Sequence, residues 1–288
     1  VFPQRCRTRA GSSWARASRV TPLLGACRID TWLLCSMNIV FLHGFTGTPG
    51  SFRWVAEALA PVEARGCAPI LVGHNGGPGE SSSFEAEVTR LSREIDEQGF
   101  RGAHLIGYSL GSRVSLGLLM HDQTQFASAT LVGVHPGLES AAARKQRVQA
   151  DEGWCDLLER QGITAFIRAW TTLPLWDSQK ALDEEKLEAQ ARDRMSHSAG
   201  GLACALRSLG LGQMPAYVER LHPLKLPVHL VVGEQDGKFL EIATRIVRQL
   251  PQGDLQVAPS AGHNVLLERP DFIAQVLRNA DTSCPHPN

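Results

Sequence analysis

The chain of 288 residues lacks the features that mark several large classes of protein. Basic and acidic side chains are equal in number, at 29 each, so there is no net charge to neutralise the phosphates of a nucleic acid. No apolar run approaches the roughly eighteen residues that a membrane-spanning helix needs. No apolar stretch is followed by a secretory cleavage site. We therefore expect neither a nucleic-acid partner nor a membrane span.

Cysteine is sparse and irregularly placed. The seven cysteines are odd in number, are widely scattered and form no C-x-x-C pair, so neither a zinc site nor a disulfide framework is predicted. A reducing compartment, the cytoplasm, is expected. Apolar residues make up 43% of the chain and charged residues 20%, a balance typical of a folded protein with a large core.

The charge is unevenly distributed along the chain. Residues 1–36 hold six arginines and one acid, a net charge of +5, and the remaining residues carry 23 basic and 28 acidic side chains. Such a basic segment is typical of a transit peptide, of a disordered tail, or of upstream sequence outside the working protein. We favour the last, because Met37 directly precedes the first apolar run. The folded domain is expected over residues 37–280, with a short tail at 281–288.

Short apolar runs alternate with segments of helical periodicity. The runs are Asn38–Leu42, Ala68–Val72, His104–Tyr108, Ala129–Val134, Val228–Val232 and Leu255–Ala258. Because they are continuous and not alternating, they predict buried parallel strands. Between them, Phe84–Gln98 has apolar residues at the spacings of three and four that are typical of a helix. The pattern predicts an α/β fold with a doubly wound, mostly parallel sheet.

The alternation is interrupted over residues 138–222, where only helical patterns occur. The predicted helices are Gln146–Arg160, Ile163–Thr171, Ser178–Met195 and Gly201–Leu209. We interpret this segment as a helical lid inserted between two strands, over the carboxyl edge of the sheet. Extra helices without a gating role are the alternative.

The strongest local signal is a G-x-S-x-G pattern at residues 107–111, between a predicted strand and a predicted helix. In this context the pattern is typical of a nucleophile elbow, and Ser109 is the predicted catalytic residue. The serine needs an imidazole, which in turn needs a carboxylate. Asp236 follows a later strand and His263 follows the last one, in the expected order. Glu234 is the fallback for the acid.

An oxyanion hole needs two backbone N–H groups, one after the serine and one in the loop after the first strand. Leu110 would supply the first and Phe45 the second. Gly44 and Gly47 give that loop the freedom to turn its amide inward. We interpret His43, beside it, as a buried structural histidine.

Several segments carry a resemblance to a known family. They are Leu42–Gly47, Gly107–Arg113, His135–Leu138, Gly233–Phe239 and Ala261–Asn264. From Met37 onward the chain resembles the α/β-hydrolase-fold proteins and, among them, the 2-succinyl-6-hydroxy-2,4-cyclohexadiene-1-carboxylate synthase family of menaquinone biosynthesis. One departure lies at residues 72–79, where many relatives read Asp-x-Pro-Gly-His-Gly and this chain has a different order with extra glycine.

The resemblance implies a lyase that eliminates pyruvate from 2-succinyl-5-enolpyruvyl-6-hydroxy-3-cyclohexene-1-carboxylate. Ser109, activated by His263, would remove a ring proton, and the oxyanion hole would hold the developing enolate. No metal or organic cofactor is implied. A serine esterase or C–C-bond hydrolase that forms an acyl-enzyme is the alternative, and a catalytically silent binding protein is a second.

A substrate with three carboxylates needs cations around it. By position in the family pattern, the substrate-binding residues would be Tyr108, Arg113, Arg147, Trp170, Arg194 and Lys238. Arg144 remains an alternative to Arg147. The resemblance therefore implies a small, anionic polycarboxylate as the substrate, and the sequence leaves the oligomeric state open.

Overall fold

The computed structural model describes residues 37–60, 62 and 64–282. The prediction for residues 1–36 lies outside the described residues. At the other end, helix α9 (Pro270–Thr282) continues past residue 280, where the domain was expected to end, and residues 283–288 are outside the described part.

Six strands form one sheet in the order β2-β1-β3-β4-β5-β6, and every neighbouring pair is parallel. The strands are β1 (Met37–Leu42), β2 (Ala64–Cys67), β3 (Ala103–Tyr108), β4 (Phe126–Val132), β5 (Val228–Gly233) and β6 (Gly253–Ala258). The first described strand, β1, lies inside the sheet, β2 lies at the edge beside it, and β3 to β6 follow one another on the other side of β1. Ligands of such sheets bind beyond the carboxyl ends of the strands, near this reversal.

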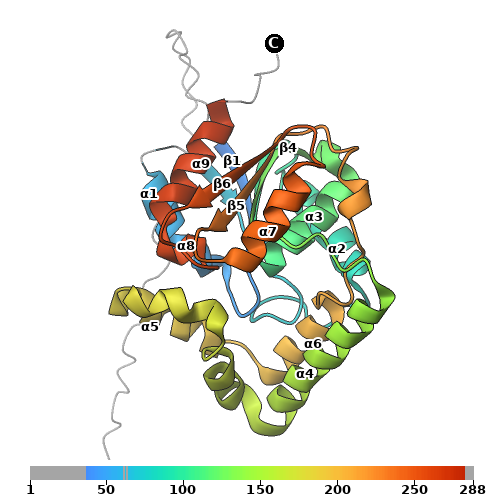
Figure 1. Ribbon diagram of the computed structural model, residues 1–288, viewed down its shortest axis with the longest axis vertical. Coiled ribbons are helices and arrows are strands. Elements are labelled where there is room, and N and C mark those ends of the chain that lie inside the picture. Colours follow the sequence, from blue (N-terminus) through green and yellow to red (C-terminus); the bar gives the residue numbers. More distant parts are fainter. Residues whose placement is uncertain (1–36, 61, 63, 283–288) are drawn as a thin grey trace, which may run out of the picture. The chain divides into compact units, whose positions relative to one another are not determined.

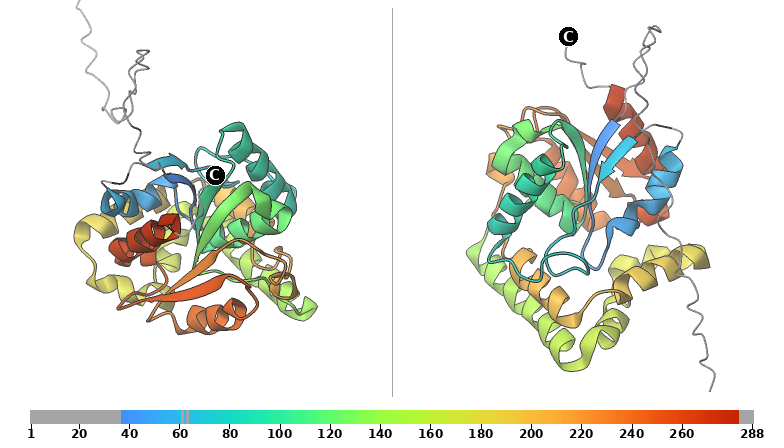
Figure 2. Two further views of the ribbon diagram at one scale, coloured as in Figure 1. Left: turned by 90° about the horizontal axis from the view of Figure 1, so that it is seen from above. Right: turned by 180° about the vertical axis from the view of Figure 1, so that it is seen from behind.

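Helices cover both faces of the sheet (Figures 1 and 2). They are α1 (Arg53–Leu59), α2 (Phe84–Glu97), α3 (Leu110–Asp122), α7 (Gly237–Val247), α8 (Val265–Glu268) and α9, with short 3-10 turns at Pro49–Phe52, Gln123–Gln125 and Val218–Arg220. Neighbouring residues of one strand belong to the cores on opposite faces of the sheet: Val40 is in a core cluster with residues of α2, α3 and α7, and Ile39 is in one with residues of α1, α8 and α9. The doubly wound arrangement that the apolar runs predicted is confirmed.

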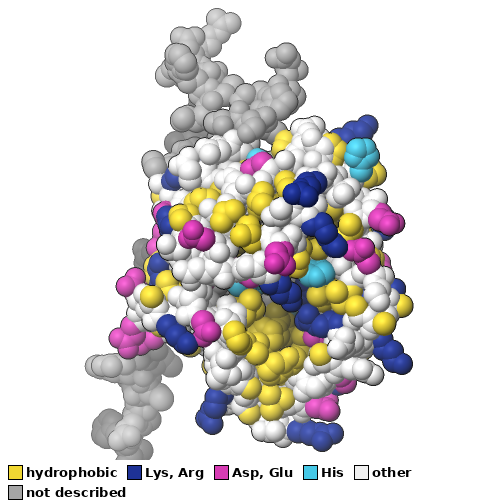
Figure 3. Space-filling model, viewed as in Figure 1, with side chains coloured by type: hydrophobic (Ala, Val, Ile, Leu, Met, Phe, Trp, Pro, Cys, Tyr) yellow, Lys and Arg dark blue, Asp and Glu magenta, His cyan; other side chains and the backbone are white. Residues whose placement is uncertain are grey.

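An all-helical insertion lies between β4 and β5, beyond the carboxyl ends of the strands (Figure 1). It consists of α4 (Ala141–Trp170), the 3-10 segment η3 (Pro174–Ala181), α5 (Glu184–Met195) and α6 (Ala199–Leu209). Apolar side chains of α4 and α6 form a separate small core, which includes Phe166 and Leu202. A cavity of about 480 Å³ opens between the insertion and the strand ends, and the hollow has apolar walls with basic side chains beside it (Figure 3).

The helices of the insertion differ in detail from the prediction. The two helices expected on either side of residues 161–162 form one element, α4, with a break at Gly162, whose φ is +78°. The helix predicted over Ser178–Met195 is wrong in its first part, because η3 ends at Ala181 and α5 begins only at Glu184. Asp183 precedes two glutamates there, a helix-start signal that the apolar spacing did not reveal.

The second predicted strand is also wrong. The strand is Ala64–Cys67, and the apolar run Ala68–Val72 that follows it is irregular although its end is buried. Pro69 lies inside this run and has no N–H group to give to a neighbouring strand.

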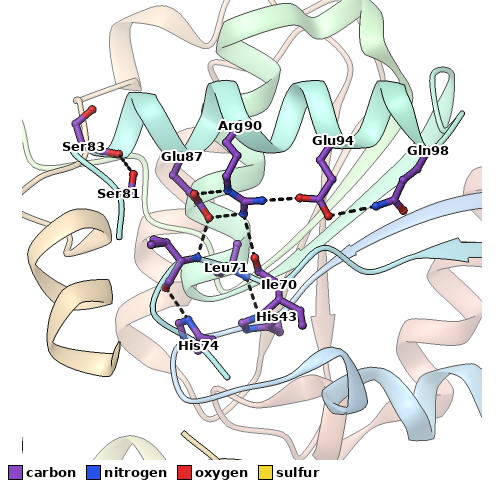
Figure 4. A network of polar contacts seen from close by, with 11 residues as sticks. His43, Ile70, Leu71, His74, Ser81, Ser83, Glu87, Arg90, Glu94 and Gln98 are labelled. Carbon is purple, nitrogen blue, oxygen red and sulfur yellow. Dashed lines mark hydrogen bonds and ion pairs between the residues drawn. The ribbon is translucent and has the colours of Figure 1, made fainter. Parts of the chain in front are cut away.

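Side chains satisfy the backbone of this run in place of a strand (Figure 4). The buried Glu87 of α2 accepts a 2.8 Å hydrogen bond from the amide of Val72. Arg90, paired with Glu87, donates to the carbonyl of Ile70 at 3.0 Å. The run therefore continues from β2 to the site without belonging to the sheet.

Candidate active site

Ser109 lies at the sharp turn between β3 and α3. Its backbone has φ 52° and ψ −105°, a conformation that residues other than glycine rarely adopt. A Cβ atom at Gly107 would lie 2.4 Å from the hydroxyl of Ser115, and one at Gly111 would lie 2.0 Å from the carbonyl oxygen of Leu42. The two glycines of the pattern are therefore required by close packing, and the strained turn carries the serine hydroxyl to the cavity wall.

His263 links Ser109 to Asp236. Its Nδ1 lies 2.6 Å from Oδ2 of Asp236, and its Nε2 lies 2.9 Å from Oγ of Ser109. Because a carboxylate can only accept, Nδ1 carries the proton and Nε2 is free to accept one from the serine. The imidazole is 2% exposed, and the Asp236 side chain is also buried. This arrangement can make the serine hydroxyl reactive toward a proton or a carbonyl carbon.

The geometry separates Asp236 from the fallback acid, Glu234. Glu234 accepts a hydrogen bond from the amide of Ser260 at 2.9 Å and does not contact the imidazole. Asp236 directly precedes α7, and its Oδ1 accepts from the amide of Phe239, so the other oxygen faces His263. The helix N-terminus thus holds the carboxylate in place.

Two residues that the sequence did not single out position the imidazole. Gly133 leaves the room for it, because a Cβ atom there would lie 2.9 Å from Cε1 of His263. Glu268 accepts from the amides of Gly262 and Asn264, on either side of the histidine, at 2.7 and 3.2 Å. A glycine after a strand and an acid five residues past a histidine are too common to have indicated these roles.

Phe45 and Leu110, whose amides were predicted to form the oxyanion hole, both line the cavity that holds Ser109. Within the described residues, neither the Phe45 nor the Leu110 amide has a hydrogen-bond acceptor. The loop that carries Phe45 turns on a 3.0 Å bond from the amide of Gly47 to the carbonyl of Gly44. His43 is buried, and its Nε2 accepts from the amide of Leu71.

Three cationic side chains line the same cavity as Ser109: Arg113, Arg147 and Lys238. Arg113 lies one turn after the serine, and it donates to the carbonyl of Leu209 in α6 at 2.7 Å. Arg147 is paired with Asp151, 2.8 Å away, which also lines the cavity and was not predicted. With one carboxylate among three cations, this part of the cavity favours an anion.

Burial and mutual repulsion affect the ionisation of this cluster. Burial and the nearby Arg147 lower the pKa of Arg113 to about 9, so it keeps its charge at neutral pH. Burial and the charge of Arg113 lower the pKa of His135, another wall residue, to about 4. His135 is therefore a neutral hydrogen-bonding group there. Its Nδ1 accepts from the amide of Gly137 at 3.1 Å, which leaves the proton on Nε2.

Two arginines of the sequence analysis lie away from the cavity wall. Arg144 donates to the carbonyls of Leu138 and Glu139, so Arg147 is the one of that pair at the cavity. Arg194 does not line this cavity, although substrate binding was predicted for it. Its guanidinium lies 4.8 Å from the ring centre of Trp176 and its charge also acts on Tyr108, and both of these residues line the cavity.

Aromatic side chains form much of the remaining wall. Tyr108 and Trp170 lie there as expected. Others were not predicted: Trp154, Trp176 and Phe239. Phe239 packs 4.5 Å from the His263 ring centre, and Trp176 lies 6.1 Å from it. Trp154 and Trp170 come from one helix, but their spacing alone did not separate a cavity wall from a core.

The described side chains include no group of three or more histidine, cysteine, aspartate or glutamate residues arranged to bind a metal ion. Within the same part of the chain, no helix combines the length and the apolar character needed to cross a bilayer.

The chain matches the model of the alpha/beta hydrolase family over residues 39–276. The 2-succinyl-6-hydroxy-2,4-cyclohexadiene-1-carboxylate synthase of Salmonella agona (strain SL483) is 29% identical over 84% of this chain and 94% of its own length. A protein of Bacillus subtilis (strain 168) that carries the same name provisionally is 30% identical over 86% of this chain and 91% of its own length.

Solved structures agree with this result. MenH from S. aureus superposes with a TM-score of 0.81 at 28% identity, covering 86% of this chain and 94% of that one. A thermophilic esterase from Thermogutta terrifontis gives 0.74 at 23% identity, over 86% of this chain and 90% of that one, which speaks to the fold alone. The chain therefore belongs to the α/β-hydrolase family and, within it, to the family of the 2-succinyl-6-hydroxy-2,4-cyclohexadiene-1-carboxylate synthases.

Proposed function

We propose that this protein is a lyase that eliminates pyruvate from 2-succinyl-5-enolpyruvyl-6-hydroxy-3-cyclohexene-1-carboxylate, giving 2-succinyl-6-hydroxy-2,4-cyclohexadiene-1-carboxylate in menaquinone biosynthesis. One observation carries the proposal: the cavity that holds Ser109 also holds Arg113, Arg147 and Lys238. A substrate with three carboxylates needs such cations, whereas a neutral ester needs only apolar walls. The names of the curated relatives support the same reaction.

Ser109 and His263 would act together as the base. The Ser109 hydroxyl gives its proton to Nε2 of His263 as its oxygen takes a proton from the substrate ring. The electrons of that C–H bond shift through the ring, the bond from the ring to the enolpyruvyl oxygen breaks, and the enolate of pyruvate leaves. The proton that the imidazolium has gained is then given up to this enolate, which yields pyruvate and restores the neutral histidine. Asp236 stabilises the imidazolium that forms, because its carboxylate is already bonded to Nδ1.

The amides of Phe45 and Leu110 would hold the charge that develops on the succinyl carbonyl oxygen. Both are free of protein acceptors among the described residues, so neither has to give up a bond when the oxyanion forms. The cations would hold the carboxylates while this happens. Arg113 is placed for this role in particular, because its bond to the Leu209 carbonyl fixes the guanidinium beside the elbow.

The alternative is a hydrolase in which Ser109 attacks a carbonyl carbon and forms an acyl-enzyme. The serine–histidine–aspartate contacts would serve that reaction equally well. The cations are the difference between the two reactions, because an acyl-enzyme mechanism on a neutral ester makes no use of them.

The test is a pair of assays on the purified protein. We expect pyruvate release from the enolpyruvyl substrate and only trace turnover of a simple aryl ester. The same preparation with Ser109→Ala is the control for contaminating activity. Rapid ester turnover without pyruvate release would reject the lyase and leave the hydrolase.

A further inference from the structure

Residues 72–79, where the sequence departs from the family pattern, pack closely against the start of α6 in the helical insertion. A Cβ atom at Gly73 would lie 2.1 Å from the carbonyl oxygen of Gly201, and one at Gly201 would lie 2.3 Å from the carbonyl oxygen of Gly73. Only glycines allow two backbones to approach this closely. The loop of residues 72–79 is therefore a joint between the insertion and the sheet domain, and the proposed mechanism makes no use of it.

A buried histidine of the insertion, His197, belongs to the same joint. It lies between α5 and α6, and its Nδ1 accepts a 3.0 Å hydrogen bond from the amide of Asn75. The proton of the neutral ring is therefore on Nε2, which has no well-aligned acceptor among the described residues. Burial lowers the pKa of His197 and the backbone of Thr46 raises it in part, so the ring is neutral at pH 7 and lies close to the Thr46 carbonyl.

Thr46 directly follows Phe45, whose amide is the proposed donor to the oxyanion. Its φ is +62°, in a region that residues other than glycine rarely occupy, and its side chain is buried. Such a conformation persists only where neighbouring groups hold it. If the backbone of Thr46 relaxed, the peptide before it would turn, and the Phe45 amide would move with it.

His74, in the loop of residues 72–79, fills the space between His197 and the oxyanion-hole loop (Figure 4). Its ring centre lies 5.1 Å from that of His197, 5.9 Å from that of Phe45 and 4.7 Å from that of His43, all in edge-to-face contacts. Its Nδ1 donates to the carbonyl of Val72 at 3.1 Å, which fixes the ring. The rings thus connect the insertion to Phe45.

We propose that His197 is a positioning residue, which from the helical insertion keeps the Phe45 amide directed at the developing oxyanion. It acts beside the Thr46 carbonyl and through the ring of His74. It does not line the catalytic cavity, so it works through these residues and not on the substrate. The inference rests on the proposed function for the identity of the oxyanion, the enolate of the succinyl group. The oxyanion hole is then complete only while the insertion packs on residues 72–79.

The experiment compares two substitutions of His197 in the full chain. His197→Asn keeps an acceptor for the Asn75 amide and removes the ring edge that faces Thr46, whereas His197→Gln places an amide N–H₂ near the position of Nε2. We expect His197→Asn to lower kcat for pyruvate release about tenfold with KM changed less than about twofold, because only the oxyanion contact is misplaced. His197→Gln should recover kcat to within about threefold of the unaltered protein. The matched control is His222→Asn, at an exposed position outside the cavity, which should change neither constant.

A second readout does not depend on the natural substrate. An alkyl fluorophosphonate labels Ser109 with loss of fluoride, and its phosphoryl oxygen needs the same two amides as the enolate. We expect the labelling rate to fall with His197→Asn and to recover with His197→Gln. A chain that releases no pyruvate, but whose labelling follows this order, would contradict the proposed function and not the role of His197.

Three results would overturn the proposal. They are an unchanged kcat and labelling rate in His197→Asn, equal losses in both His197 variants, and an unaltered chain that the fluorophosphonate does not label. A rise in KM at constant kcat would also count against it, because a loosened insertion would displace Arg147 and not the Phe45 amide. If His197→Asn does not fold, as judged by its thermal unfolding midpoint, His74→Asn is the second variant. It can keep the bond to the Val72 carbonyl, and the same fall in kcat is expected.

Discussion

The two sides of the catalytic cavity are built in different ways. On the sheet side, Ser109, Asp236 and His263 each follow the end of a strand and are joined by hydrogen bonds of 2.6 and 2.9 Å. On the insertion side, Arg147 comes from a long helix, and the one ion-pair partner that it has among the described residues, Asp151, lies on the same helix. The hydrogen bonds of the sheet side are already made, whereas the positive charges of the insertion side are only partly neutralised and suit an anionic ligand.

This difference separates chemistry from recognition. The α/β-hydrolase sheet places the same three groups whatever the substrate is, because strand ends and helix starts determine their positions. The insertion decides which molecule reaches them. An esterase and a lyase could share the first side, so variants on the second side are the ones that distinguish the two functions.

The largest effect is expected on the sheet side. Ser109→Ala should lower kcat for pyruvate release by about 10³-fold or more, because the proton relay loses its first member. Asp236→Asn should cost roughly 10³–10⁴-fold, since Nδ1 of His263 loses its acceptor. Steady-state pyruvate assays measure both. Glu234→Gln is the matched control and should stay within a few-fold of the unaltered protein; an equal loss there would contradict the assignment of the acid.

The next effect concerns stability. His104 of β3 is buried between the hydroxyls of Ser128 and Thr130, and burial lowers its pKa to about 3. Below pH 6.5 the unfolded chain binds a proton here that the folded chain does not, so stability falls as the pH drops toward the folded pKa. The share of this one histidine is about 2–3 kcal/mol between pH 6.5 and 4.5.

Urea unfolding at several pH values measures this loss. His104→Gln keeps hydrogen-bonding groups between the two hydroxyls without a group that titrates in this range, and it should flatten the pH dependence. His121→Gln, at an exposed position on α3, should leave the dependence as it is. If both variants behave alike, the acid sensitivity does not arise in the sheet.

The sequence predicted the sheet side of the molecule better than the insertion side. The parallel sheet and its helices were predictable because buried strands are continuous apolar runs with caps and turns between them. The run Ala68–Val72 was the exception, since its apolar side chains are buried but Pro69 and the side chains of Glu87 and Arg90 take its backbone out of the sheet. A hydrophobic pattern reports burial and does not report hydrogen-bond partners.

The residues of the candidate site also fall into those of the sheet side, which could be predicted, and those of the insertion side, which could not be placed as well. Residues 109, 236 and 263 could be placed because their positions are tied to strand ends. The insertion side could not be placed with the same accuracy, because a helical side chain faces a cavity or a neighbour according to packing between helices far apart in sequence. Arg194 is the example: it is not itself on the wall of the catalytic cavity, but its charge acts on two residues that are, Trp176 and Tyr108.

Arg113→Gln is expected to have the third largest effect. The loss of one charge-assisted carboxylate contact, about 1.5–3 kcal/mol, corresponds to a fall in kcat/KM of roughly 10–150-fold. Arg144→Gln is the matched control, because Arg144 bonds to backbone carbonyls away from the cavity. It should change kcat/KM by less than about threefold. Equal effects of the two substitutions would show that Arg113 does not contact the substrate.

The smallest expected effect is a gain in apparent substrate affinity, whereas the other catalytic variants lose activity. Asp151 accepts from Arg147 at 2.8 Å, and its charge also acts on Arg113, so it competes with the substrate for both guanidinium groups. Asp151→Asn keeps the shape and removes the charge, and it should lower KM by roughly two- to fivefold, in line with the 0.2–1 kcal/mol of a partly exposed ion pair. The matched control is Asp156→Asn, whose partner Arg160 lies on an exposed part of α4. A rise in KM with Asp151→Asn would mean that the acid orients Arg147 toward the substrate, and the insertion side would then be as fixed as the sheet side.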